Sequence, residues 1–327
     1  MSESVEMFFG FAGRRHYDGW SGSLRGEVLR LPTTVIDDLR LYIEPLGHSW
    51  RTAHRPRVSS AVIDHVRDLV AGALDADGLA ILTGDGFSGF SDNVLAGFHL
   101  AIAEGLGNPV GQNGSNDILV EVYAPLAPRE LGVRGYQDND SMLLHSDAAD
   151  FSGLMCLSQA DSGGTSLFAS ALDIHDVLAE EAPDLLPHYY CDWFWNVGAL
   201  GFPDVERPIR LPIFSVWRGR LSCRYSSSLL RGGAVAAGET LTAVQVRALD
   251  LFEEVALRDD VVVRHRLIRG ESVWMNNQTL LHGRDAFRDS TDCKRRLLRA
   301  WSRSSSAHQR WLRIARFDDY LFHGLKT

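Results

Sequence analysis

The residues of this chain that are best suited to chemistry begin with a histidine and an aspartate two positions apart. His145 and Asp147 end the short run Leu143-Leu144-His145-Ser146-Asp147. Because alternate side chains of an extended strand point to the same face, we expect the imidazole and the carboxylate to project together. A neutral nitrogen donor beside an anionic oxygen donor suits a divalent first-row metal, and the lack of thiolates argues against a closed zinc site.

Two ligands hold a metal weakly, so a third must come from elsewhere in the chain. His282, within segment 276–284, is the candidate. Two histidines and one carboxylate form a facial triad, the ligand set of non-haem Fe(II) oxygenases, which leaves three coordination positions open. A competing pair, His16-Tyr17-Asp18, has no strand period around it and follows two arginines whose charge would oppose a cation. The alternative for His145 itself is a packing role at the end of an apolar strand.

The composition of the 327-residue chain is typical of a soluble globular protein, with 45% apolar and 23% charged residues. Its formal net charge of −9, without a long basic block, argues against nucleic acid as a partner and favours a small molecule. The four cysteines are far apart and show no paired spacing, which indicates a reducing compartment. With neither a signal-peptide pattern nor a membrane-spanning apolar segment, we expect a cytoplasmic protein without membrane contact.

Local patterns predict helices early in the chain and short strands later. Helices are expected over 60–74 and after Ser91, with a strand at 79–83 between them, whereas prolines leave residues 1–58 unassigned. Two more helices, over 172–180 and from the capping box at Thr242 to about 257, interrupt the later strands. The later strands are predicted at 118–123, 142–147, 153–157, 166–169, from Trp193, and at 211–216, 221–225, 261–266, 272–276 and 297–301.

This order predicts a mainly β fold, a double-stranded β-helix (jelly-roll) core buttressed by flanking α-helices, because regular βα alternation is missing. We expect one domain over residues 1–327, with about 1–110 as the buttress and about 111–302 as the core. The C-terminal helical extension, about 303–327, would form a lid or pack at a subunit contact of a homo-oligomer. A jelly roll brings distant residues onto facing strands, so the early pair and the later histidine can meet at its mouth.

An apolar strand that carries arginines follows the third candidate ligand. Within 294–301, a period of two places Arg295, Leu297 and Arg299 on one face. An arginine inside a jelly roll needs an anion, and a dicarboxylate that chelates the metal at one end would supply it. The alternative is a solvated basic run, against which the interleaved leucines count.

Taken in order, the motifs of the chain resemble those of the taurine dioxygenase and clavaminate synthase-like (TauD/TfdA) family. The motifs are His145-x-Asp147, Gly163-Gly164-Thr165-Ser166-Leu167-Phe168-Ala169, Arg269-Gly270-Glu271, Asn277, His282-Gly283-Arg284 and Arg295-x-x-x-Arg299. The match runs from about Ile118 to Trp301. The resemblance implies a dioxygenase (EC 1.14.11.-) that uses Fe(II), 2-oxoglutarate and O2 and releases succinate and CO2.

Carried over residue by residue, the resemblance also implies roles at the site. The iron ligands would be His145, Asp147 and His282. Arg295 would hold the distal carboxylate of 2-oxoglutarate, and the Ser166 hydroxyl would bond the same group, with Thr165 as second choice. Arg299 would face the substrate or the metal-binding end of the co-substrate. Since Asp147 fills the position that related halogenases leave to chloride, hydroxylation is the expected reaction, while desaturation, ring closure and epoxidation stay open.

The identity of the substrate is less constrained. A small amino acid-like or specialised metabolite is expected, with Ser141 and Asn139 as candidates for its pocket and Arg299 favouring an anionic group. The further candidates Trp193, Trp195, Arg224 and Tyr225 suit packing equally well. Two other functions use the same features: a metal-dependent hydrolase that binds zinc with these ligands, and a non-catalytic jelly-roll binding protein.

Overall fold

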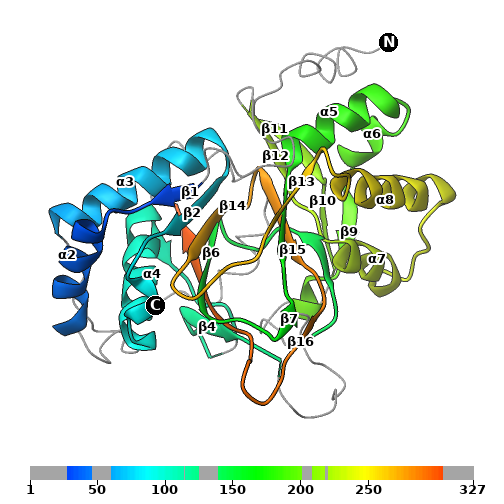
Figure 1. Ribbon diagram of the computed structural model, residues 1–327. Helices are drawn as coiled ribbons and strands as arrows, with labels where there is room; N and C mark the ends of the chain where they lie inside the picture. The colour runs from blue at the N-terminus through cyan, green and yellow to red at the C-terminus, as the bar shows by residue number, and fades with distance from the viewer. Residues whose placement is uncertain are drawn as a thin grey trace.

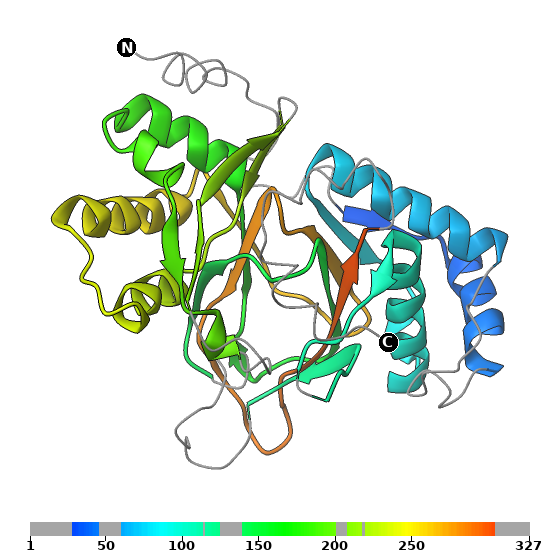
Figure 2. The same cartoon turned by 180° about the vertical axis from the view of Figure 1, so that it is seen from behind.

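The computed structural model describes residues 28–45, 60–113, 115–124, 139–200, 208–217 and 220–304. In these ranges, β-sheets lie between two groups of helices (Figures 1 and 2). The helices are α2 (Thr33–Ile43), α3 (Ala61–Ala76), α4 (Asp92–Leu106), α5 (Ala171–Glu181), α6 (Leu186–Tyr189), α7 (Ser227–Ala236) and α8 (Ala243–Ala256). The strands are β1 (Val28–Arg30), β2 (Leu79–Thr83), β3 (Asn108–Pro109), β4 (Leu119–Val122), β5 (Met142–His145), β6 (Phe151–Ser158), β7 (Ser162–Gly163), β8 (Ser166–Ser170), β9 (Trp193–Trp195), β10 (Ile209–Leu211), β11 (Phe214–Trp217), β12 (Arg220–Cys223), β13 (Val262–His265), β14 (Ser272–Asn276), β15 (Leu280–Arg284), β16 (Phe287–Arg288) and β17 (Arg296–Arg303).

Two main sheets make the jelly-roll core. The larger has the order β1-β2-β14-β6-β17-β3, with β4 also paired to β17, and the smaller has the order β13-β8-β15-β5. Apart from the parallel pair β1–β2, the pairings in both are antiparallel. Apolar side chains from both sheets meet in one buried cluster, which includes Ile81, Phe168, Val263, Met275 and Leu297. The sheets therefore face each other, and the predicted mainly β fold class is confirmed.

Each sheet is covered on its outer face by one group of helices. The core around α2, α3 and α4 includes Leu82, Met155 and Leu298 from the larger sheet. The core around α5 to α8 includes Leu144 and Leu281 from the smaller sheet. Burial on both faces explains why the strands near the site are short apolar runs rather than alternating patterns. No helix in the described ranges is long and apolar enough to cross a bilayer.

Most of the predicted helices are confirmed, and so are their signals. Ser60 and Ser91 accept hydrogen bonds from Ile63 N and Val94 N, and so cap α3 and α4. The capping box of α8 is present, with Thr242 and Gln245 satisfying each other's backbone N–H groups. The strands predicted at 211–216 and 221–225 overlap β11 and β12, which pair as antiparallel strands.

Other elements differ from the prediction. The helices α2, α6 and α7 were not expected, and α7 contains the pair Gly232-Gly233, which disfavours a helix in isolation. A Cβ on Gly233 would lie 2.0 Å from the Phe194 carbonyl oxygen, so glycine lets α7 pack against β9. The strand predicted at 211–216 is divided between β10 and β11. The competing pair His16 and Asp18 and the extension at 305–327 lie outside the described residues.

Candidate metal centre

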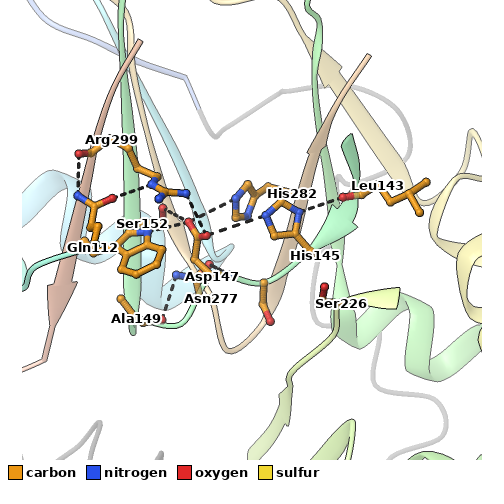
Figure 3. A network of polar contacts seen from close by, with 12 residues as sticks. Gln112, Leu143, His145, Asp147, Ala149, Ser152, Ser226, Asn277, His282 and Arg299 are labelled. Atoms are coloured by element: carbon orange, nitrogen blue, oxygen red, sulfur yellow. Dashed lines mark hydrogen bonds and ion pairs between the residues drawn. The ribbon is translucent and has the colours of Figure 1, made fainter. Parts of the chain in front are cut away.

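Three candidate ligands converge at one end of the smaller sheet (Figure 3). The His145 Nε2 atom lies 3.9 Å from Asp147 Oδ1, and His282 Nε2 lies 3.5 Å from Asp147 Oδ2. The two imidazole ring centroids are 4.4 Å apart. Three donor atoms, one from each residue, lie within 4.8 Å of one another. Asp147 and His282 are buried, whereas His145 is partly open to solvent, so the cluster has an accessible side.

The sheet register brings the two histidines together. His282 in β15 pairs directly with His145 in β5, so both rings project from neighbouring strands of the same sheet. The expectation that they would lie on facing strands is therefore wrong. The strand predicted at 142–147 also ends early, at His145, and Asp147 reaches the cluster from the turn beyond it.

Hydrogen bonds to the backbone hold this turn in place. The Asp147 N–H donates to Asn277 Oδ1 at 3.2 Å, and Asn277 Nδ2 donates to the Ala149 carbonyl at 3.0 Å. Arg224 Nη1 donates to the Asp147 carbonyl at 2.7 Å. These contacts fix the direction in which the carboxylate leaves the main chain. Arg224 was a candidate for the pocket wall, but its side chain instead donates to the backbone of the turn that carries Asp147.

The carboxylate of Asp147 is the most elaborately bonded group of the cluster. Ser152 Oγ and Trp301 Nε1 donate to its Oδ2 at 2.6 and 2.8 Å, and Arg299 Nη1 lies 3.5 Å from Oδ1. Burial alone would raise the pKa of Asp147, but Arg299, His282, His145 and the Ser152 hydrogen bond outweigh it and hold that pKa well below its usual range. The group is therefore anionic at neutral pH, as a metal ligand must be.

The two imidazoles are also arranged as metal ligands. Burial, together with the neighbouring His145, lowers the pKa of His282 to about 3, so this imidazole is neutral near pH 7. His145 Nδ1 lies 2.9 Å from the Leu143 carbonyl oxygen. A proton on Nδ1 donated to this carbonyl leaves the lone pair of Nε2 directed at the cluster, the usual arrangement of a metal-binding histidine.

Arg295 and Ser166 are both buried, and for Arg295 the strand pattern predicted an inward position. Arg295 is 2% exposed, and its Nε and Nη1 atoms have no hydrogen-bond partner among the described residues. Its guanidinium lies 5.3 Å from the Phe287 ring centroid. Burial, and next the charge of Arg284, lowers the pKa of Arg295 to about 10. A buried cation left unpaired in this way fits an anionic ligand, such as a carboxylate.

The two hydroxyl candidates differ in burial. Ser166 is buried and shares an inner face of β8 with Phe168, whose ring belongs to the cluster between the sheets. Thr165 comes before the strand and is half-buried, and its carbonyl accepts the Asp285 N–H. Gly164, with φ +74°, lets the chain approach Arg295 closely, because a Cβ there would lie 3.2 Å from Arg295 Cδ.

The candidate substrate residues are spread more widely. Asn139 and Ser141 are exposed just before β5, and Leu143, 51% exposed, is two residues from His145 on the same face. Arg299 is buried; its Nε donates to Gln112 Oε1 at 2.6 Å, and its Nη1 lies 3.5 Å from Asp147 Oδ1. The wall candidates Trp193 and Trp195 are packed in the helical core. Gln112, Ser152 and Trp301 had no assigned site role in the sequence, because single residues without a spacing pattern give no signal.

Comparisons with known proteins agree with this geometry. Residues 43–301 match the family described as "Taurine catabolism dioxygenase TauD, TfdA family". The chain is 36% identical over 242 residues to FR-33289 synthase of Streptomyces rubellomurinus, a match that covers 71% of this chain and 70% of the relative. It is 30% identical over 161 residues to the taurine hydroxylase-like protein SAT17 of Stachybotrys chartarum, covering 48% and 40% of the two chains.

Solved structures share the fold. Asparagine oxygenase in complex with Fe(II), hydroxyasparagine and succinate has a TM-score of 0.66 at 17% identity and covers 84% of this chain and 93% of its own. The non-haem iron oxygenase OrfP in complex with Fe and α-ketoglutaric acid has a TM-score of 0.60 at 16% identity, covering 86% and 96%. At these identities the likeness shows the double-stranded β-helix fold alone.

The chain belongs to the TauD/TfdA family. It is an Fe(II)- and 2-oxoglutarate-dependent dioxygenase, and the predictions of family, reaction class and cofactors are confirmed.

Proposed function

We propose that this dioxygenase hydroxylates an unactivated C–H bond of a small amino acid-like or specialised metabolite, releasing succinate and CO2. The observation that supports the proposal is that the same jelly-roll core contains both a set of metal ligands and a buried, unpaired arginine. Three ligands suited to iron converge, and Arg295 is buried without an ion-pair partner among the described residues. A hydrolase would need the first feature and would have no use for the second.

In this proposal His145, Asp147 and His282 hold the iron, and Arg295 holds the distal carboxylate of 2-oxoglutarate. Ser166, on the inner face of β8, is the better hydroxyl for the same carboxylate, with Thr165 second. Iron and 2-oxoglutarate, when bound, supply the oxidising chemistry with O2. The chain supplies the neutral His282 imidazole, an anionic Asp147, a guanidinium for the co-substrate and an interior that excludes water.

The substrate would approach from the exposed side of His145. Asn139 and Ser141, which are exposed just before β5, would line that approach with polar side chains beside the apolar Leu143. Arg299 faces Asp147 and so favours the metal-binding end of the co-substrate over a substrate anion. The substitution Arg299→Ala separates these roles: unchanged affinity for the true substrate would exclude Arg299 as its anchor.

The reaction is tested by succinate formation with Fe(II), 2-oxoglutarate and a panel of metabolites. Asparagine and arginine belong in the panel because hydroxylated forms of them are bound in the structural relatives. We expect one panel member to stimulate succinate release and to gain one oxygen atom. His145→Ala should abolish this activity, whereas His65→Ala, at an exposed position of α3, should not. Hydrolysis without 2-oxoglutarate would support the zinc alternative, and binding without turnover would support a binding protein.

We also propose the wider setting of this activity. The chain would act as one oxygenase domain, with about 111–302 as its catalytic core and about 1–110 and 303–327 as flanking parts. It would act in the cytoplasm on a small molecule, with neither nucleic acid nor a membrane as partner. Size-exclusion chromatography with light scattering would decide whether it forms a homo-oligomer.

A further inference from the structure

The two oxygens of Asp147 have different surroundings. Oδ2 accepts two short hydrogen bonds, from Ser152 Oγ at 2.6 Å and from Trp301 Nε1 at 2.8 Å. Oδ1 lies 3.9 Å from His145 Nε2 and receives only a long contact, at 3.5 Å, from Arg299 Nη1, while His282 Nε2 lies 3.5 Å from Oδ2. Because both short hydrogen bonds are made to Oδ2, Oδ1 is the oxygen with less competition for binding a metal.

The sheet register delivers both donors to the same oxygen. Trp301 in β17 and Ser152 in β6 are directly paired across the antiparallel ladder of the larger sheet. Their side chains therefore lie side by side on one face and approach Asp147 together. Trp301 is 4% exposed, so its N–H has no competition from bulk water.

The indole is itself held in orientation. The guanidinium of Arg299 lies 4.5 Å from the Trp301 ring centroid, in a cation–π contact. Gln112, which is fully buried, fixes that guanidinium by accepting from Arg299 Nε at 2.6 Å, and it also donates to the carbonyls of Arg299 and Ile118. The stack of Gln112, Arg299 and Trp301 leaves the indole N–H one direction, towards Asp147 Oδ2.

We propose that Trp301 is a positioning residue that holds Asp147 as a one-oxygen ligand of the iron. This inference rests on the proposed role of Asp147 in metal binding. A carboxylate that bound through both oxygens would fill two coordination positions, and three must stay open for the family's chemistry. Because the indole N–H holds Oδ2, Asp147 binds the iron through Oδ1 only. The coordination position that Oδ2 would otherwise occupy then stays open.

Another buried tryptophan shows that this contact is not a general result of burying an indole. Trp274 is fully buried, and its Nε1 has no hydrogen-bond partner among the described residues. Trp274→Phe therefore removes an indole of the same size from the larger sheet without removing a bond to Asp147. It is the matched control for Trp301→Phe.

The test is metal affinity, measured anaerobically by calorimetry with Mn(II), together with the visible spectrum of the Co(II) protein. Loss of a hydrogen-bonding group behind a metal ligand typically weakens metal binding by about 10- to 100-fold. We expect Trp301→Phe to weaken Mn(II) binding by about tenfold and to change the Co(II) spectrum, because Asp147 can then turn both oxygens to the metal. Trp301→His, which keeps a ring N–H, should restore part of the affinity, and Trp274→Phe should behave as the unmodified protein.

Two outcomes would overturn the positioning role. One is that Trp301→Phe keeps the wild-type Mn(II) affinity and Co(II) spectrum. The other is that Trp274→Phe loses as much Mn(II) affinity as Trp301→Phe. If Trp301→Phe does not fold, NMR of the ¹⁵N-tryptophan-labelled protein decides: one of the eight indole N–H resonances must move when Zn(II) is added, and no movement refutes the proposal. Failure of the unmodified protein to bind any divalent metal would instead refute the proposed function.

Discussion

Replacing Arg295 by methionine should have opposite effects on the stability of the protein and on its affinity for 2-oxoglutarate. In the absence of co-substrate, this guanidinium is buried without an ion-pair partner among the described residues. We therefore expect Arg295→Met to stabilise the ligand-free protein, because it removes an uncompensated buried charge. The same change should weaken 2-oxoglutarate binding, because it removes the cation that awaits the distal carboxylate.

The size of both effects follows from the structure. The pKa of Arg295 is lowered from 12.5 to about 10, by burial first and then by Arg284, which corresponds to about 3 kcal/mol against keeping the charge in the folded protein. Loss of the cation–π contact with the Phe287 ring destabilises the variant by about 1 kcal/mol. The ligand-free variant should gain about 2 kcal/mol in free energy of unfolding. Loss of a buried, charge-assisted pair of about 3 kcal/mol weakens co-substrate binding by about 100-fold.

Urea denaturation without ligands and calorimetric titration with Mn(II) and 2-oxoglutarate measure these quantities. The matched control is Arg296→Met, the next residue, whose side chain pairs with Asp92 and Glu121 on the other face of β17. This control should keep its 2-oxoglutarate affinity and should gain no stability. An unchanged 2-oxoglutarate affinity in Arg295→Met, or an equal loss of that affinity in Arg295→Met and Arg296→Met, would show that Arg295 does not bind the co-substrate.

Two other predictions concern a hydroxyl and a buried histidine. Ser166→Ala should weaken 2-oxoglutarate binding by about tenfold through loss of one charged hydrogen bond, whereas Thr165→Val should not, and calorimetry compares them; the reverse order would assign the contact to Thr165. Burial lowers the pKa of His99 to about 3, so the folded protein resists a proton that the unfolded chain accepts below about 6.5. The contribution of His99 to the free energy of unfolding is therefore complete above that pH and is lost as the pH falls towards 3. In urea denaturation, the free energy of unfolding of His99→Gln should fall less steeply with decreasing pH, and an unchanged slope would contradict this.

The sequence could single out the candidate ligands because two of them are close together and the third lies in a family motif, and the structure brings the three side chains together. The β-strand period placed Arg295, Leu297 and Arg299 on one face, and all three side chains are buried. The jelly roll followed from many short strands without βα alternation, and it is the observed architecture.

The parts that could not be predicted depend on pairing between distant strands. That β15 lies beside β5 and joins the two histidines, rather than facing it, is a property of the sheet register. Ser152 and Trp301 are separated by about 150 residues and look like ordinary strand residues until β6 and β17 pair. Helix α7 was missed because Gly232-Gly233 lowers its helix propensity, whereas packing against β9 determines the structure there.

Anaerobic titration decides whether His145, Asp147 and His282 bind one iron together with 2-oxoglutarate. Fe(II) and 2-oxoglutarate are added together, and the visible absorption band of the chelate is recorded. We predict that the band forms in the unmodified protein and in His65→Ala, and that it is lost in His145→Ala, Asp147→Ala and His282→Ala. A band of full intensity in any of these three variants would contradict the account.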